Sequence, residues 1–210
     1  MRPLPWLIAI VITAGICWRF PLFHVVSLKQ AQQERAAATF NPKEVAEKFW
    51  NERLLKSLDQ AVKAEVLLSA IQTDATAARK KFSRNMGVSE SCTYFVSGTG
   101  RVLEISDDEI SLAVTAGSTN AEISLQVGLL FSNAVRDGTG LLSVNDYPNS
   151  QDFNSISEAL NRIIEERVQP RLRETAKVGA TIRFTGCAEV NDVSSDLKPL
   201  KVIPIAATVE

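Results

Sequence analysis

Residues 127–167, VGLLFSNAVRDGTGLLSVNDYPNSQDFNSISEALNRIIEER, form the stretch around which the rest of the chain is arranged. Its first part is dense in polar, turn-forming side chains. Its second part places apolar side chains at spacings of three and four from Phe153 to Leu172, which predicts an amphipathic helix with one buried face. Strand-like segments lie on both sides, so this helix is expected to interrupt a sheet.

The ends of this helix have recognisable signals. Two capping-box spacings, Asn149–Asp152 and Ser155–Glu158, leave its first residue open between two positions. Pro170 predicts a kink or a new segment, and Gly179 predicts a stop. We expect the apolar face of the helix to plug one end of a barrel.

Alternating apolar and polar residues predict three strands before the helix and two after it. The expected strands are Thr93–Ile105 with a glycine break at Gly98–Gly100, Glu109–Val114, Glu122–Val127, Ala180–Thr185 and Leu200–Ile205. Because proline cannot donate to a ladder, Pro204 predicts an edge or a break in the last strand. This order predicts an α+β fold, a five-stranded OB-like β-barrel with a long helix between strands 3 and 4. An open α+β sandwich is the alternative.

The chain begins with two residues, Met1 and Arg2, followed by an apolar run that reaches Trp18. This pattern predicts a signal anchor or a lipoprotein-type signal segment over residues 1–26. Cys17 follows a lipobox-like Ala-Gly-Ile and is a candidate for lipidation, although Ile16 stands where a small residue is usual. Both readings predict a protein that is exported and held at the periplasmic face of the inner membrane.

Three further regions are expected after this segment. They are a tether at 27–40, a helical neck at 41–90 and the barrel domain at 91–210. Asn41, with Pro42 and Glu44, predicts a capped helix start. An apolar stripe at helical spacing continues from Val45 through Phe49, Trp50, Leu54 and Leu58 to Val62. Two more helices are predicted at Ala64–Ile71 and Ala75–Phe82, the second ending at Asn85–Gly87.

Composition excludes several kinds of function. The chain has 23 basic and 24 acidic residues, and its longest basic cluster is the Arg79–Lys81 triplet, so we expect no nucleic-acid partner. Its single histidine, His24, lies beside the predicted membrane segment, which argues against histidine-based catalysis in the folded domain. No metal and no cofactor are expected. Cys92 and Cys187 either form a disulfide in an oxidising compartment or remain two buried thiols.

The polar centre supplies the candidate ligand-binding residues. They are Asn133, Arg136, Asp137, Asn145, Asp146, Tyr147, Asn149, Gln151 and Asp152. On one interpretation they form turns and caps. On the other, Arg136 offers a planar fork to a carboxylate or phosphate, the aspartates fix hydroxyl groups, and Tyr147 forms an apolar wall. A carboxylate pair drawn from Asp137, Asp146 and Glu158 is a further alternative, whereas the spacing does not match a calcium loop of the EF-hand type.

Several segments together resemble a known family. They are FNPKEVAEKFWNERLL, GLLFSNAVRDGTGLLSVNDYPNSQDFNSISEALN, KVGATIRFTGCAEVN and the closing PLKVIPIAATVE. They are similar to DUF2291, a bacterial family of predicted periplasmic lipoproteins to which no function is assigned. The resemblance implies a location outside the cytoplasmic membrane and an association with sugar-type ABC transport components. It assigns no active site.

We therefore expect a membrane-anchored, non-enzymatic accessory or binding protein. Its partner would be an ABC transporter component, a solute-binding protein or a small polar solute, contacted through the surface from Asn133 to Asp152. The alternatives are an exported carboxylate-dependent hydrolase and a structural envelope protein. An exposed apolar patch on the barrel would favour the structural role.

Overall fold

The computed structural model describes residues 27, 40–84, 91–147, 149–191 and 196–210. The chain divides into two units, Met1–Phe40 and Asn41–Glu210, and all the elements below belong to the second, which is compact. The predicted membrane segment with Cys17 and His24, most of the tether and the helix stop at Asn85–Gly87 lie outside the described residues. Of the helices within the described ranges, none is long and apolar enough to span a bilayer.

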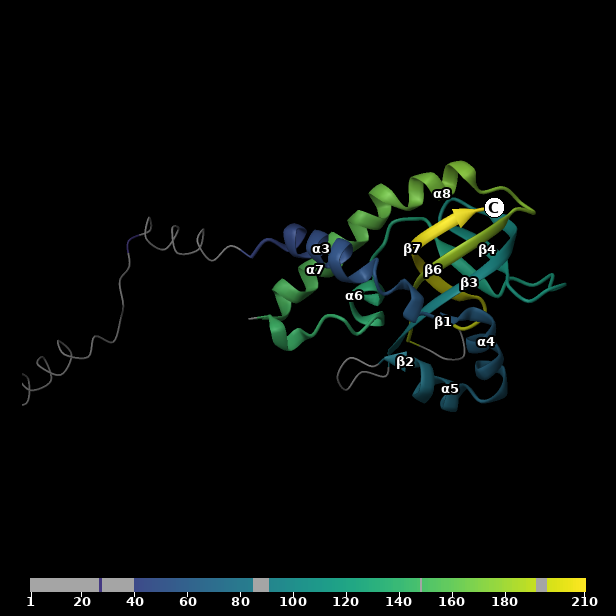
Figure 1. Cartoon of the computed structure of the whole chain (residues 1–210), viewed down its shortest axis with the longest axis horizontal. Coiled ribbons are helices and arrows are strands. Elements are labelled where there is room, and N and C mark those ends of the chain that lie inside the picture. The colour runs from purple at the N-terminus through teal and green to yellow at the C-terminus, as the bar shows by residue number, and fades with distance from the viewer. Residues whose placement is uncertain (1–26, 28–39, 85–90, 148, 192–195) are drawn as a thin grey trace, which may run out of the picture. The chain divides into compact units, whose positions relative to one another are not determined.

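Five strands close into a ring. They are β3 (Cys92–Ile105), β4 (Glu109–Ala113), β5 (Ile123–Gln126), β6 (Thr181–Val190) and β7 (Leu200–Val209). The neighbours run β3, β4, β5, β7, β6 and back to β3, and every pair is antiparallel except β5 with β7. The predicted order of three strands, a helix and two strands is confirmed, and so is the closed sheet, which excludes the open sandwich (Figure 1).

Strand β3 is the longest strand and pairs along most of its length. It runs without interruption for 14 residues, so the predicted glycine break is wrong. Its residues from Cys92 to Arg101 pair with β6, and its last part pairs with β4. A Cβ atom on Gly98 would lie 2.9 Å from the Cβ of Ala64, closer than two such atoms approach. Glycine here therefore lets a helix pack close to the strand and does not end the strand.

The predicted disturbance at Pro204 is confirmed. Thr185 pairs with Ala206, whereas Gly186 pairs with Pro204, so β7 contains one extra residue at this point. Such a bulge accommodates a residue that cannot donate a ladder hydrogen bond. The strand continues to Val209 beyond it, further than the predicted end at Ile205.

Residues 41–63 differ from the predicted continuous stripe. Helix α3 (Pro42–Phe49) begins as expected, with the Asn41 side chain accepting from the Glu44 amide at 3.4 Å. It then passes into a π-helical turn, η1 (Trp50–Leu54), and a 3-10 turn, η2 (Leu58–Gln60). Val62 belongs to strand β1 (Val62–Lys63), which runs parallel to β3. A helical spacing of apolar side chains therefore did not determine the backbone where an open strand edge offered hydrogen bonds.

The helical pair that follows also joins the barrel. Helices α4 (Ala64–Thr73) and α5 (Ala75–Phe82) are confirmed, and Asp74 caps α5 by accepting from the Ala77 amide at 2.9 Å. Strand β2 (Ser83–Arg84) then pairs with β3. The described part of the predicted neck is thus in the same compact unit as the barrel.

The long helix between β5 and β6 is split where Pro170 predicted a new segment. Helix α7 (Ser150–Arg167) uses Asn149 as its cap, which settles the open start, and α8 (Gln169–Thr175) has Pro170 in its first turn. The predicted plug is wrong for α7, which packs against α3 and the short helix α6 (Ala134–Gly138) and extends away from the barrel in Figure 1. Of α7 and α8, only α8 contributes to the barrel core, through Leu172.

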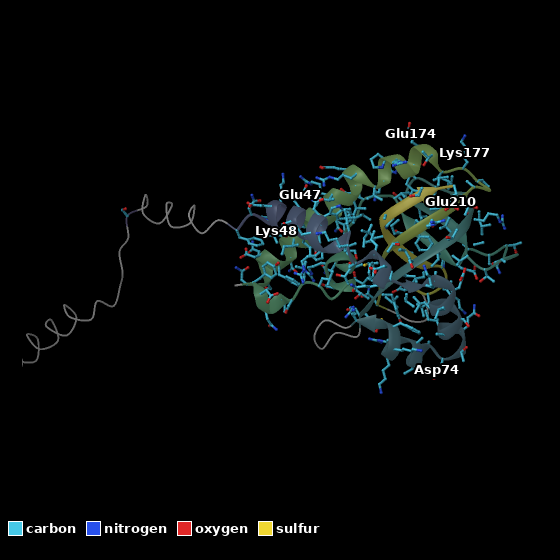
Figure 2. The ribbon with its side chains drawn as sticks, viewed as in Figure 1. Glu47, Lys48, Asp74, Glu174, Lys177 and Glu210 are labelled. Atoms are coloured by element: carbon cyan, nitrogen blue, oxygen red, sulfur yellow. The ribbon has the colours of Figure 1, made fainter. Side chains whose placement is uncertain are left out.

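An ion pair also links α3 to α7. The two guanidinium nitrogens of Arg167 bind the two carboxylate oxygens of Glu47, whose position on α3 is labelled in Figure 2. The apolar face of α7 is thus covered by a neighbour from the start of the compact unit. The barrel keeps its own core, formed by side chains such as Tyr94, Ile110, Leu125 and Ile182.

Candidate functional site

The polar centre folds around α6, a helix whose five residues are all buried. Arg136 and Asp137 are adjacent and pair through two hydrogen bonds. The Nε of Arg136 donates to Oδ1 of Asp137 at 2.6 Å, and its Nη2 donates to Oδ2 at 2.9 Å. Each residue is only 6% exposed. The planar fork that sequence analysis assigned to a ligand is therefore occupied by the neighbouring carboxylate.

The remaining side of the Arg136 guanidinium is also engaged. Its Nη1 donates to Oδ1 of Asn154 at 2.8 Å and to the carbonyl oxygen of Phe153 at 3.4 Å. The group lies over the Phe153 ring, 4.0 Å from the ring centre, and Tyr147 packs on the same ring with 5.3 Å between centres. Arg136 thus holds α6 against the start of α7, through charge and through stacking.

The other predicted ligand residues have different surroundings. Asn149 and Asp152 form the cap of α7, with the Asn149 side chain accepting from the Asp152 amide at 2.8 Å. Asn145 and Asp146 lie in the 3-10 turn η3 (Val144–Asp146). The residues that remain exposed to solvent in this region are Asn133, Asn145, Asp146, Asn149 and Gln151. The structure thus brings Arg136 and Tyr147 together around Phe153, with Asp137 bound to Arg136, and places the exposed residues in turns, in caps and, for Gln151, in the first turn of α7.

The carboxylates proposed for hydrolysis have unequal environments. Asp137 is buried against Arg136, whereas Asp146 and Glu158 are exposed on η3 and α7. At Tyr147, burial raises the pKa of the phenol and the Asp146 carboxylate raises it further, while Arg53 acts in the opposite direction. Within the described residues, no group of three His, Cys, Asp or Glu side chains is arranged to hold a metal ion.

The two buried cysteines are free thiols on opposite faces of the barrel wall. Cys92 belongs to the barrel core with Tyr94, whereas Cys187, paired in register with Phe95, lies under Gly138 of α6. Because successive residues of a strand face opposite sides, the two sulfur atoms point apart, and the disulfide alternative is wrong. Burial raises the pKa of Cys187, and the nearby Asp137 carboxylate raises it further, so this thiol is a packing group.

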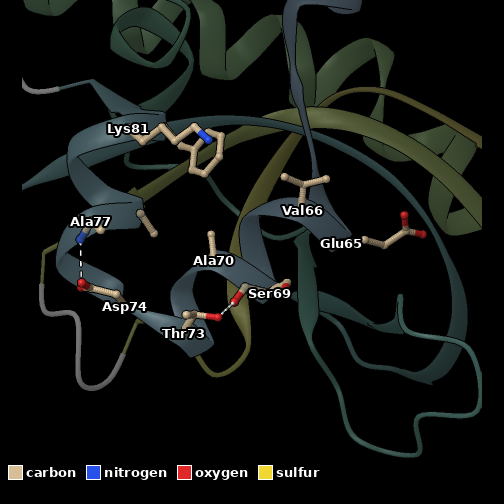
Figure 3. A pocket seen from close by; sticks show the side chains of 10 residues that line it. Glu65, Val66, Ser69, Ala70, Thr73, Asp74, Ala77 and Lys81 are labelled. Carbon is tan, nitrogen blue, oxygen red and sulfur yellow. Dashed lines mark hydrogen bonds between the residues drawn. The ribbon is translucent and has the colours of Figure 1, made fainter.

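A groove of about 570 Å³ lies between α4 and α5. Figure 3 shows Val66 and Ala70 of α4 facing this space, together with Ala77 and Lys81 of α5. Two of its polar side chains serve the helices themselves, since Asp74 caps α5 and Thr73 donates to the carbonyl of Ser69. The surface of the groove is mainly apolar, and Glu65 and Lys81 are its remaining charged lining residues.

A second feature was missed by sequence analysis. Residues 128–132, between β5 and α6, run along α7 and α8 and are bound to them by side chains. Leu129 is 78% exposed and Phe131 is 91% exposed, whereas Leu130 between them is 8% exposed. Large apolar side chains that are this exposed are typical of an interaction surface, and these two lie in the loop between β5 and α6, outside the barrel strands. The signal in the sequence was the apolar triplet itself, within an otherwise polar loop.

Four helix side chains, each four residues after the last, hold this segment. Gln169 donates to the carbonyl of Gly128 at 2.9 Å, and Glu165 accepts from the Leu130 amide at 2.8 Å. Asn161 donates to the carbonyls of Leu130 and Ser132 at 3.4 and 3.0 Å, and Arg173 donates to the carbonyl of Val127. Residues four apart lie on one helix face, so the row binds the backbone at intervals from Val127 to Ser132.

An acidic groove adjoins the segment. It has a volume of about 640 Å³ and lies between the β3–β4 turn and the α7–α8 junction. Its charged side chains are Asp107, Asp108, Glu165 and Arg173. The guanidinium of Arg173 donates to two backbone carbonyls, those of Val127 and Asp107. Leu129 and Ile105 form apolar walls, so the groove offers apolar contact beside an excess of negative charge.

Comparison with solved structures supports the barrel assignment. The chain is similar to an OB-fold protein from Thermotoga maritima, with 25% sequence identity and a TM-score of 0.72. The similarity covers 81% of this chain and 99% of the other. No curated protein matches the chain. The ring of five strands thus resembles an OB-fold barrel, within a mixed α+β fold.

The family comparison gives the location. The matching model is described as "Predicted periplasmic lipoprotein (DUF2291)", and this description implies a periplasmic protein anchored to a membrane. The match extends from residue 6 to residue 208, and the chain therefore belongs to the DUF2291 family of predicted periplasmic lipoproteins.

Proposed function

We propose that this chain is a non-enzymatic accessory protein that binds another protein at the periplasmic face of the inner membrane. One observation carries the proposal: Leu129 and Phe131 are exposed on a backbone that four helix side chains hold in place. Burying such side chains against a partner removes apolar area from water. A backbone that is already ordered loses little conformational entropy on binding.

The environment of Arg136 supports a protein partner over a small polar solute. Its fork binds Asp137, and its remaining nitrogen binds Asn154 and Phe153. A solute carboxylate or phosphate would have to displace these buried contacts. The family resemblance favours a component of a sugar-type ABC transport system, or its solute-binding protein, as the partner.

The test is a pull-down of the full chain from membranes in mild detergent after brief cross-linking. The double variant Leu129→Ser/Phe131→Ser is compared with Val178→Ser, which changes an apolar residue that is 68% exposed elsewhere. We expect a transport component with the wild type and with Val178→Ser, and roughly tenfold less with the double variant, as for the loss of a hot spot.

Two results would overturn the proposal. One is equal recovery by the double variant, which would show that Leu129 and Phe131 take no part. The other is recovery of general envelope proteins without any transport component, which would favour the structural role instead.

A further inference from the structure

The hydrogen bonds of residues 128–132 alternate along the backbone. The carbonyl of Gly128, the amide and carbonyl of Leu130, and the carbonyl of Ser132 all bind side chains of α7 and α8. In an extended chain, successive residues direct their backbone polar groups to opposite sides. The backbone amides and carbonyls of Leu129 and Phe131 bind none of these helix side chains, and in the described part of the chain they have no hydrogen-bond partner.

The exposure of successive residues alternates in the same way. Gly128 and Leu130 are buried, and Leu129 and Phe131 are exposed. The segment thus has the two properties of an edge strand, an open row of amides and carbonyls and an apolar face. An extended peptide satisfies both, because its own amides and carbonyls complete the ladder and its alternate side chains cover the apolar face.

The charge of the adjoining groove decides between the candidate partners of residues 128–132. The adjoining groove carries three carboxylates, those of Asp107, Asp108 and Glu165, against the single guanidinium of Arg173. A second copy of this chain would bring the same three carboxylates to the contact, and an anionic lipid surface would bring phosphates. Both are repelled, whereas a peptide with lysine or arginine next to its apolar residues is attracted.

We infer that residues 128–132 bind an extended segment of the partner by β-strand addition. The bound segment alternates apolar residues, which pack on Leu129 and Phe131, and carries a cationic residue that enters the acidic groove. This inference rests on the proposed function, since it specifies how the same surface binds its partner.

The first test uses a displayed library of short peptides. Valine or isoleucine alternates with threonine, and the flanking positions are randomised among lysine, arginine, aspartate, glutamate and serine. Selection on the full chain in detergent is expected to enrich lysine or arginine at a flank by at least tenfold. Binding of the enriched peptides is expected to be lost in Leu129→Ser/Phe131→Ser and kept in Val178→Ser. A selection that yields no binder, or that favours acidic flanks, overturns the inference.

The second test reads the mode of binding by amide hydrogen exchange. In the free protein, the Leu130 amide is expected to exchange slowly because it is bonded to Glu165, while the Leu129 and Phe131 amides exchange fast. The selected peptide is expected to slow exchange at one or both of Leu129 and Phe131. The same peptide N-methylated at alternate backbone nitrogens cannot complete the ladder and is expected to bind at least tenfold more weakly.

The outcomes separate this inference from the proposed function. If a transport component is recovered but the Leu129 and Phe131 amides stay unprotected, the protein binds its partner without strand addition and the inference fails alone. If the Leu129 and Phe131 amides become protected from exchange as the protein concentration rises, without peptide, then a second copy of the chain binds this edge. Cosedimentation of residues 41–210, lacking the membrane segment, with anionic phospholipid vesicles assigns it to the membrane. Either of these results overturns the inference.

Discussion

Helix α6 and residues 128–132 are separated by a single residue, Asn133, yet the fold treats their side chains in opposite ways. The charged pair Arg136–Asp137 is buried, and the two side chains form hydrogen bonds with each other and with Asn154. The apolar pair Leu129 and Phe131 is exposed, on a backbone that is firmly held. This difference shows that the polar side chains of a loop often bind one another or the loop backbone, so that they are not available to a ligand. Side chains that remain exposed on an ordered backbone, such as Leu129 and Phe131, are the better guide to a binding surface.

The largest effect is expected from Asp137→Ala. This change leaves the Arg136 guanidinium buried without its main partner, so we expect the free energy of unfolding to fall by about 3–5 kcal/mol in urea denaturation. The matched control is Glu210→Ala, which breaks the exposed pair with Arg183 and is expected to change stability by about 0–1 kcal/mol. A loss for Asp137→Ala as small as that of the control would show that the buried pair is dispensable.

The second effect tests the packing of α6 on the barrel. A Cβ atom at Gly138 would lie 2.7 Å from Sγ of Cys187, so we expect Gly138→Ala to cost about 1–3 kcal/mol of stability by overpacking. Cys187→Ala removes that sulfur, and the double variant is expected to lose less than the sum of the two single losses. Double-mutant analysis of urea denaturation measures the coupling, and strict additivity would contradict the contact.

A smaller loss of stability is expected when a contact between α7 and residues 128–132 is removed. Glu165→Ala removes the acceptor of the Leu130 amide, and we expect a loss of about 1 kcal/mol together with faster exchange at that amide. Glu158→Ala, on the exposed face of the same helix, is the control. If exchange at Leu130 is unchanged in Glu165→Ala, the row of helix side chains does not order the segment.

The smallest stability effect is expected at the exposed pair itself. Leu129→Ser and Phe131→Ser remove little buried area, so each is expected to change the free energy of unfolding by less than about 0.5 kcal/mol. Their effect should instead be seen in partner recovery. A large destabilisation would mean that these side chains serve the fold, and the contrast with Arg136–Asp137 would disappear.

Much of the barrel could be predicted because its signals are local. The sequence alternation of apolar and polar residues in β5 and the capping residues Asn41 and Asn149 depend on neighbouring residues alone. What a surface packs against is not local. The apolar stripe of α7 predicted a buried face, but only the three-dimensional structure shows that α3 covers it. Val62 likewise continued a helical spacing but joined a strand edge.

The candidate site was harder to predict for the same reason. Arg136 and Asp137 have the chemistry of a binding site, and sequence alone does not reveal that Asn154 and Phe153 complete their contacts. The exposure of Phe131 is equally invisible, because apolar triplets are usually buried. The spacing of four from Asn161 to Arg173 could be recognised in the sequence, but its target, the backbone of residues 127–132, could not.

The arrangement of strands around β3 affects the risk that the chain aggregates while it is exported. β1 and β2 precede β3 in the chain and lie along one of its edges, while β6, on the other edge, comes from much later. A polypeptide emerging from a translocation pore with its amino end leading delivers β1 and β2 first. One edge of β3 can then be paired between Thr93 and Ser97 before β6 is available, which lowers the risk of intermolecular sheet formation during export.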